Sequence, residues 1–225
     1  MVTKSPKPKT PKSRTAAPAR DRARTEQAIL DAIGRLILRE GLPGVGINAL
    51  AREAGADKVL IYRYFGDLDG VYKAFAERSD FWWTLDEILG TPRPDPRKTG
   101  FPELAKILFR RHAAAIRARP VTLAVIAAEL EDRTALVVAL EEVREQRALE
   151  LEKWLDETYS QVDGVDLPAV TTLITAAIDY LAARARKIRI YGGVGIKGDA
   201  EWERLLAAVD QIIDGLFPTH RRKPQ

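Results

Sequence analysis

A short segment of the sequence carries side chains of the kinds that recognise DNA base edges. On a helix over residues 58–65 with Ile61 turned inward, the outward face holds Val59, Leu60, Tyr62 and Arg63. An arginine can donate two hydrogen bonds to guanine, and apolar side chains can pack on thymine methyl groups. Tyr62 can reach a phosphate oxygen. This outward face is therefore a candidate for contact with the major groove.

A second short helix comes directly before this segment. Residues 47–54 have helical periodicity, and Gly55 supplies a tight turn into the next helix, which Asp57 is expected to cap. Two small residues, Ala51 and Ala54, let the helices cross closely. The pair has the pattern of a helix-turn-helix. The remaining DNA-contact candidates are Asn48 on the first helix, Lys58 and Tyr64 on the second, and Thr25 upstream. A helical hairpin packed into a larger core is the alternative.

Charge is concentrated at the two ends of the chain. The formal net charge is +4, but residues 1–24 hold eight basic side chains and one acid. Arg221, Arg222 and Lys223 add three positive charges, which leaves −6 for residues 25–220. The composition of 1–24 predicts a disordered basic arm, and 218–225 a basic tail. Non-specific attraction to phosphates is assigned to these ends, chiefly to the arm.

The elements between the two ends are predicted to be helical throughout. Thr25 is expected to cap the first helix, whose apolar stripe includes Ile29, Ile33 and Leu36. The predicted fold is all-α with about nine helices and no strand. The expected helices are 25–40, 47–54, 58–65, 68–89, two opened by Pro102 and Pro120, 134–159, 168–190, and 199–217 capped by Asp199. The glycine-rich segment 191–198 is predicted to be a loop.

Composition argues against catalysis. The chain has no cysteine and two histidines, so thiolate chemistry and histidine-rich metal sites are excluded, and no Ser/His/acid triad is apparent. The glycine-rich loop follows a helix and lacks the Gly-Lys-Ser/Thr ending of a P-loop. No catalytic residue, metal or cofactor is expected. No apolar run is long enough to cross a bilayer, and a cytoplasmic protein without a membrane partner is expected.

The stretch from residue 25 to residue 75 resembles the TetR family of bacterial transcriptional regulators. The Leu50-Ala51, Ala54-Gly55, Ile61-Tyr62 and Tyr64-Phe65 pairs match the family signature in order and spacing. Two positions depart from it. Gly46 stands where the family commonly has a capping threonine, and Leu68, between Asp67 and Asp69, stands where it commonly has a phosphate-binding lysine.

The resemblance implies two domains and a homodimer. A helix-turn-helix domain over 25–71 would bind double-stranded operator DNA, and 72–217 would bind a small-molecule effector and dimerise. The last two helices carry apolar stripes that suit a four-helix dimer interface, although many of these residues are expected in ordinary core. The interface candidates are Leu173, Ala177, Leu181, Leu205, Val209, Ile212, Ile213 and Leu216.

Helices of the 72–217 domain would surround a ligand cavity. The candidate lining residues are Trp82, Trp83, Phe109, His112, Glu129, Trp154 and Tyr180, and core packing is the alternative for each. Glu129 follows an apolar run, so it either faces inward and needs a partner or caps the helix end near Arg133.

These features predict a ligand-responsive regulator, most simply a repressor that a small molecule releases from a palindromic operator. Gly46 and Leu68 favour an alternative, a helical protein-interaction or small-molecule-binding protein with weakened DNA binding. A small helical enzyme is a third reading, against which the missing catalytic constellation argues.

Overall fold

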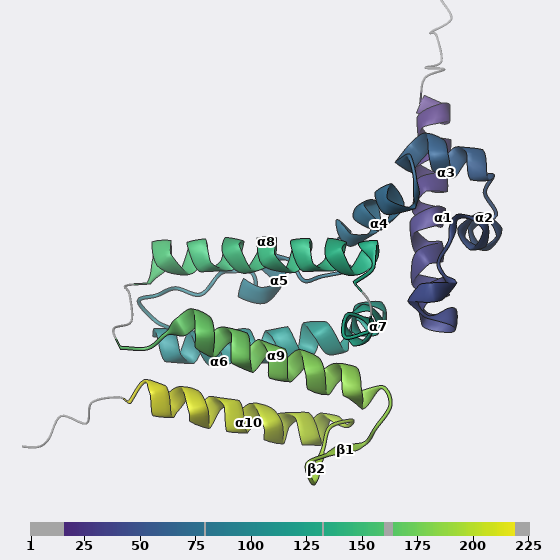
Figure 1. The fold of residues 1–225 in the computed structure, drawn as a ribbon. Coiled ribbons are helices and arrows are strands. Elements are labelled where there is room, and N and C mark those ends of the chain that lie inside the picture. Colours follow the sequence, from purple (N-terminus) through teal and green to yellow (C-terminus); the bar gives the residue numbers. More distant parts are fainter. Residues whose placement is uncertain (1–15, 79, 132, 160–163, 219–225) are drawn as a thin grey trace, which may run out of the picture.

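The N-terminal part of the chain forms four α-helices and one 3₁₀ turn that gather at one end of the molecule (Figure 1). A computed structural model describes residues 16–78, 80–131, 133–159 and 164–218. The N-terminal elements are α1 (Ala16–Glu40), the 3₁₀ turn (Leu42–Gly44), α2 (Ile47–Ala54), α3 (Lys58–Phe65) and α4 (Leu68–Ala76).

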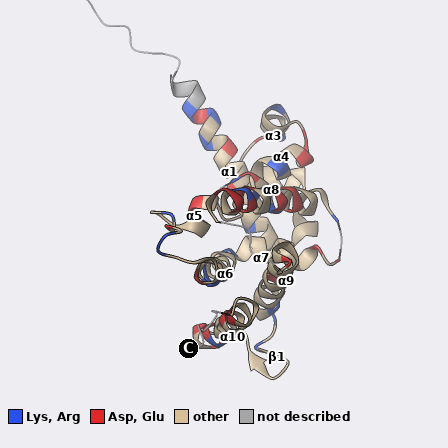
Figure 2. Cartoon of the chain, turned by 90° about the vertical axis from the view of Figure 1, so that its left-hand side faces the viewer, with Lys and Arg blue, Asp and Glu red and all other residues tan. Residues whose placement is uncertain are grey.

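The remaining helices form a bundle beside them. Figure 2 looks along the long helices α6, α8, α9 and α10, and Figure 1 shows them from the side. The elements are α5 (Leu85–Leu89), α6 (Phe101–Arg117), α7 (Pro120–Ala128), α8 (Ala135–Thr158), α9 (Leu167–Ala185), β1 (Ile190–Tyr191), β2 (Val194–Gly195) and α10 (Asp199–Leu216). Within the described residues, no helix is long and apolar enough to cross a membrane.

The apolar stripe of α1 builds the core of the N-terminal end. Ile29, Ile33 and Leu36 are fully buried, as are Leu50 of α2 and Ile61 of α3. Helix α1 packs against α2, α3 and α4, and also against α7 of the bundle. Burying one such side chain contributes about 1.5–3 kcal/mol, so this stripe is the main force that orients α3.

The turn chemistry of this end confirms the helix-turn-helix prediction. Helix α2 has the expected bounds, and Gly55 adopts a left-handed conformation with φ of 63° that side chains disfavour. The Asp57 carboxylate accepts a hydrogen bond from the Val59 N–H at 2.8 Å, and Asp67 accepts one from the Gly70 N–H at 2.8 Å. Both caps satisfy amides that a helix start leaves without partners.

The first helix starts earlier than predicted. Helix α1 begins at Ala16, so residues 16–24, expected within the disordered arm, are helical, while residues 1–15 lie outside the described residues. Thr25 is therefore not a cap. Its hydroxyl donates to the Asp21 carbonyl one turn earlier, at 2.9 Å. The prediction failed because alanine and arginine are strong helix formers, and they extend the helix without an apolar stripe.

The predicted helix 68–89 is wrong as one element. It ends at Ala76, and α5 restarts at Leu85, so the described residues contain ten α-helices where nine were expected. Three consecutive aromatic side chains, Phe81, Trp82 and Trp83, are all buried. A helix cannot turn three successive residues to one face, so the chain leaves the helix to bury all of them.

The connection between the last two helices is also more ordered than predicted. Helix α9 ends at Ala185, and the expected loop holds a two-stranded antiparallel hairpin in which Tyr191 pairs with Val194. Gly192 and Gly193, with φ of 55° and 80°, form its turn. Gly198, and not Asp199, is the N-cap residue of α10.

Candidate nucleic-acid interface and candidate ligand cavity

The outward face of α3 is exposed as predicted. Val59 is 65% exposed and Tyr62 is 53% exposed, Arg63 is also exposed, and Leu60 is half-buried at the edge of this face. Ile61, fully buried against α1, sets the rotation of the helix. An exposed Val–Tyr–Arg face is unusual for a plainly solvated surface, and its side chains can read base edges in a major groove.

Tyr64 and Lys58, two further DNA-contact candidates on α3, differ in their environment. Tyr64 is half-buried against the core, whereas Lys58, the first residue of the helix, is exposed. Tyr64 accepts a hydrogen bond from Arg63 Nη2 at 3.2 Å, and the Arg63 guanidinium lies 5.1 Å from the Tyr64 ring centroid. Tyr64 thus holds the guanidinium of Arg63 beside the other side chains of the outward face of α3.

The helical extension of α1 brings positive charge to α3. Arg20, Arg22 and Arg24 are exposed on its first turns, which project from the body in Figure 2. The Arg22 guanidinium lies 5.0 Å from the centroid of the Tyr64 ring, so this basic segment runs beside the candidate recognition helix. Positive charge at this place can follow a phosphate backbone.

The two positions that depart from the family pattern have clear structural consequences. Gly46 is the N-cap residue of α2 and supplies no side-chain hydrogen bond, while the neighbouring Asn48 is exposed. Leu68 is half-buried and packs against the core, so it adds apolar contact where a lysine would add charge.

A half-buried arginine contacts α1 from the turn that leads into the bundle. Arg78, in the turn between α4 and α5, contacts Asp31 of α1 at 2.6 Å and Asp80 at 2.7 Å. Phe81, which follows, accepts a hydrogen bond from the Thr122 hydroxyl of α7 through its carbonyl. Trp82 and Trp83 come next in the chain and belong to the wall of the bundle cavity. This wall is therefore only a few residues away from Arg78, which contacts α1.

The bundle encloses a cavity of about 1220 Å³. Six of the seven predicted lining residues border it, namely Trp82, Trp83, Phe109, His112, Glu129 and Tyr180. Trp154 does not. It lies behind the wall, with its ring centroid 6.0 Å from that of Tyr159, which does line the cavity. The volume suits an organic ligand, and the lining is mainly apolar and aromatic.

A chain of polar contacts crosses the buried end of this cavity. Trp83 Nε1 donates to His112 Nδ1 at 3.0 Å, and His112 Nε2 lies 2.8 Å from Asp179 Oδ1. An indole N–H is only a donor, so His112 Nδ1 carries no proton and its Nε2–H donates to Asp179. Sequence reasoning missed Asp179, because its i−4 and i+4 neighbours on α9 give no sign of a partner 67 residues away.

Glu129 faces inward, as one of its two predicted readings required. Its carboxylate lies 3.3 Å from the guanidinium of Arg144 on α8. Arg133, the partner expected in the other reading, pairs with Glu141 instead. Burial raises the pKa of Glu129; Arg144 acts in the opposite direction, and Asp179 and Glu141 raise it further. Arg144 was also missed, since its acidic neighbours on α8 suggested a solvated face.

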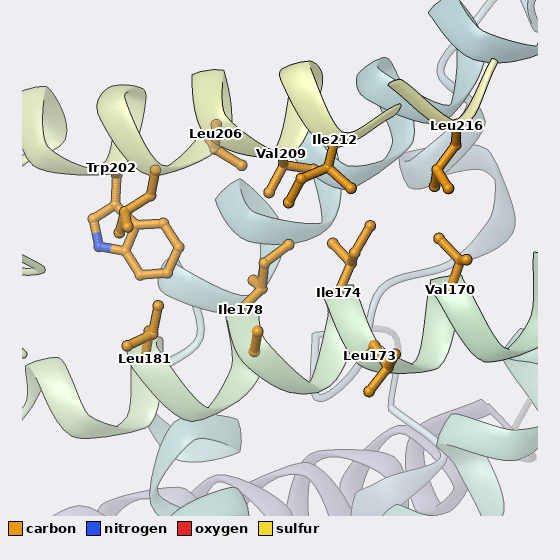
Figure 3. A pocket seen from close by; sticks show the side chains of 12 residues that line it. Val170, Leu173, Ile174, Ile178, Leu181, Trp202, Leu206, Val209, Ile212 and Leu216 are labelled. Carbon is orange, nitrogen blue, oxygen red and sulfur yellow. The ribbon is translucent and has the colours of Figure 1, made fainter. Parts of the chain in front are cut away.

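A second apolar concavity of about 500 Å³ lies between α9 and α10 (Figure 3). Seven predicted interface residues line it, namely Leu173, Ala177, Leu181, Leu205, Val209, Ile212 and Leu216. Leu173 is 72% exposed and Ile212 is 53% exposed. The prediction is wrong for Ile213, which is 1% exposed and lines the cavity instead. Ile213 follows the buried Leu206 by about two helical turns and Trp202 by about three, so it shares their inward side.

Comparisons with known proteins place the helix-turn-helix in a described family. Residues 29–75 match the family model for bacterial regulatory proteins of the tetR family. No curated protein matches the sequence.

Solved structures share the fold of most of the chain. The fatty acid degradation regulator FadR from Bacillus halodurans has a TM-score of 0.59 at 21% identity, covering 87% of this chain and 97% of its own. A putative TetR-family transcriptional regulator from Rhodococcus sp. has a TM-score of 0.58 at 18% identity, covering 85% and 99%. A TetR family regulator from Marinobacter aquaeolei VT8 has a TM-score of 0.55 at 15% identity, covering 87% and 97%.

Glu129 and Glu53 are predicted to affect stability in opposite directions. The raised pKa of Glu129 means that its protonated form favours the folded state and its ionisation opposes folding. The stability that the protonated form contributes is lost as the pH rises through the raised pKa. Hydrogen bonds from Arg39 and Arg35 lower the pKa of Glu53, so its ionisation supports folding and that support is lost as the pH falls. At pH 7, Glu129→Gln should leave the free energy of unfolding in urea unchanged or higher, and Glu53→Gln should lower it. Both differences should shrink near pH 4. A larger loss for Glu129→Gln than for Glu53→Gln at pH 7 would contradict this assignment.

Proposed function

We propose that this TetR-family DNA-binding transcriptional regulator binds a palindromic operator as a homodimer and releases it when a small molecule occupies the bundle cavity. Repression relieved by an effector is the simplest form of this activity. The exposed Val59, Tyr62 and Arg63 on α3 carry the proposal. They form a surface whose groups match base edges, on a helix held by a buried core.

Specific readout is assigned to α3 and non-specific attraction to the segment before it. Arg63 would donate to guanine O6 and N7, and Val59 would contact a thymine methyl. Lys58, Asn48 and Tyr62 would hold the phosphate backbone. Arg20, Arg22 and Arg24 beside α3 would add salt-dependent affinity, together with the basic side chains of residues 1–15.

Homodimerisation is assigned to the concavity between α9 and α10. Exposed Leu173 and Ile212 extend its apolar surface, and a second copy related by a two-fold axis would cover both. Two copies of α3 would then face two half-sites about 34 Å apart, one turn of DNA.

The response to a ligand is assigned to the turn between α4 and α5. A ligand in contact with Trp82 and Trp83 would displace the segment to which Arg78 and Phe81 belong. Arg78 contacts Asp31 of α1, and Phe81 contacts Thr122 of α7. A ligand that binds better to one setting of this turn would shift the population toward that setting. The spacing of the two recognition helices would change with it.

DNA binding is tested with the purified full chain and the DNA upstream of its own gene. Affinity for this DNA should exceed affinity for shuffled DNA by about 10³-fold or more, and should fall steeply with salt. Equal affinity for both sequences at moderate salt would instead support the helical interaction protein with weakened DNA binding.

Arg63→Ala is predicted to weaken specific binding by about 1–3 kcal/mol and to relax the preference at one base position. Arg204→Ala, which removes the same charge from an exposed site on α10, is the control and should leave affinity unchanged. Fluorescence anisotropy with the upstream DNA and single-base variants measures both effects. If the two variants bind alike, Arg63 does not read a base.

Ile212→Glu is predicted to separate the dimer, because a charge without a partner would be buried against the second copy. The dimer dissociation constant should rise by at least about a hundredfold. Gln211→Glu is the control, since it adds the same charge at the exposed neighbouring residue. Analytical ultracentrifugation measures both. A dimer that survives Ile212→Glu unchanged places the interface elsewhere.

A further inference from the structure

Two carboxylates lie at the buried end of the bundle cavity. Asp179 of α9 is 9% exposed, and Glu129 at the end of α7 has a side chain that is 21% exposed. Both line the cavity, and burial raises the pKa of Glu129, to which the nearby charge of Asp179 adds. Buried carboxylates ordinarily need cationic partners or several hydrogen-bond donors.

The partner of Asp179 is a neutral imidazole. Since Trp83 donates to His112 Nδ1, the ring holds its single proton on Nε2, and this proton is shared with Asp179 Oδ1. The described hydrogen bonds include none to the second oxygen of Asp179. The carboxylate is therefore oriented by His112, but its negative charge is not neutralised.

Arg144 of α8 is the cationic partner of Glu129 in this cavity. Arg144 Nη1 lies 3.3 and 3.4 Å from the two oxygens of Glu129. Other arginine–carboxylate pairs of this chain are tighter, such as Arg110 with Asp210 at 2.7 Å. Over the whole described lining, seven carboxylates stand against three basic side chains. The described lining of the cavity thus carries an excess of negative charge.

Aromatic rings also line this cavity. Trp82, Trp83 and Phe109 are at most 7% exposed, and Tyr180 is 39% exposed. The faces of such rings attract cations, most strongly where water is excluded. An anionic ligand would meet both the ring faces and the two carboxylates unfavourably.

We propose that the cavity binds an organic cation, with the positive group of the ligand between Asp179 and Glu129 and its apolar body against the aromatic rings. This inference rests on the proposed function only in that the cavity is taken as the effector site. Amphipathic anions, such as fatty acids, are disfavoured by the same charges.

Two ions of matched shape and opposite charge test the proposal. Tetraphenylphosphonium and tetraphenylborate both keep their charge at every usable pH, so calorimetric titration of the full chain isolates the sign of the charge. The phosphonium ion should bind at least about tenfold more tightly than the borate. Equal or tighter binding of the borate, or no saturable binding of either ion, overturns the proposal.

Variants locate the charge that is responsible. Glu129→Gln should weaken phosphonium binding by about fivefold or more. Glu142→Gln changes the net charge equally at an exposed site on α8 outside the cavity lining, and should leave binding unchanged. Equal effects of the two variants overturn the proposal, because the preference would then come from the overall charge. Urea unfolding confirms that both variants are folded.

The titrations involve no DNA, so the two assignments can fail separately. Sequence-specific binding to the upstream DNA without a preference for the phosphonium ion refutes the organic cation alone. A clear phosphonium preference without sequence-specific DNA binding refutes the regulatory function alone.

Discussion

The packing of α1 is the contact on which both ends of the molecule depend. Its buried stripe holds α2 and α3, and the same helix packs against α7 of the bundle. Gly34 of α1 lies close to Val121 of α7, since a Cβ at Gly34 would stand at the ordinary contact distance of 3.5 Å from that side chain. Protein interiors are densely packed and do not deform continuously, so a displacement of α7 has to move α1 or break its contacts. The orientation of α3 is thereby tied to the wall of the cavity.

Charged groups in this chain divide into two kinds. Asp57 and Asp67 cap helices, and Glu53 is held by two arginines, so each carboxylate has donors that favour its charge. Asp179 and Glu129 face a cavity, one with a neutral partner and one with a loosely held guanidinium. Ionisable groups in costly environments within a cavity are typical of functional sites. The charge balance inside the bundle therefore says more about the ligand than the total of +4 does.

Most local structure could be predicted from the sequence, because caps, glycine turns and apolar stripes act over a few residues. The bounds of α2, the cap of α3 and six cavity residues follow from such patterns. The break after Ala76, the inward side of Ile213 and the His112–Asp179 contact depend on tertiary packing, which local periodicity does not encode. The early start of α1 has a different cause, because there helix propensity alone sustains the helix without a buried face.

The central claim is that two copies of α3 read a two-fold symmetric site. Hydroxyl-radical and guanine-methylation footprinting of the DNA upstream of the gene tests it most directly. A homodimer bound in this way should give two protected major-groove patches related by symmetry, with centres about 34 Å apart or a multiple of that spacing, and Arg63→Ala should lose the guanine protection. A single protected patch, or guanine protection that survives Arg63→Ala, would contradict it.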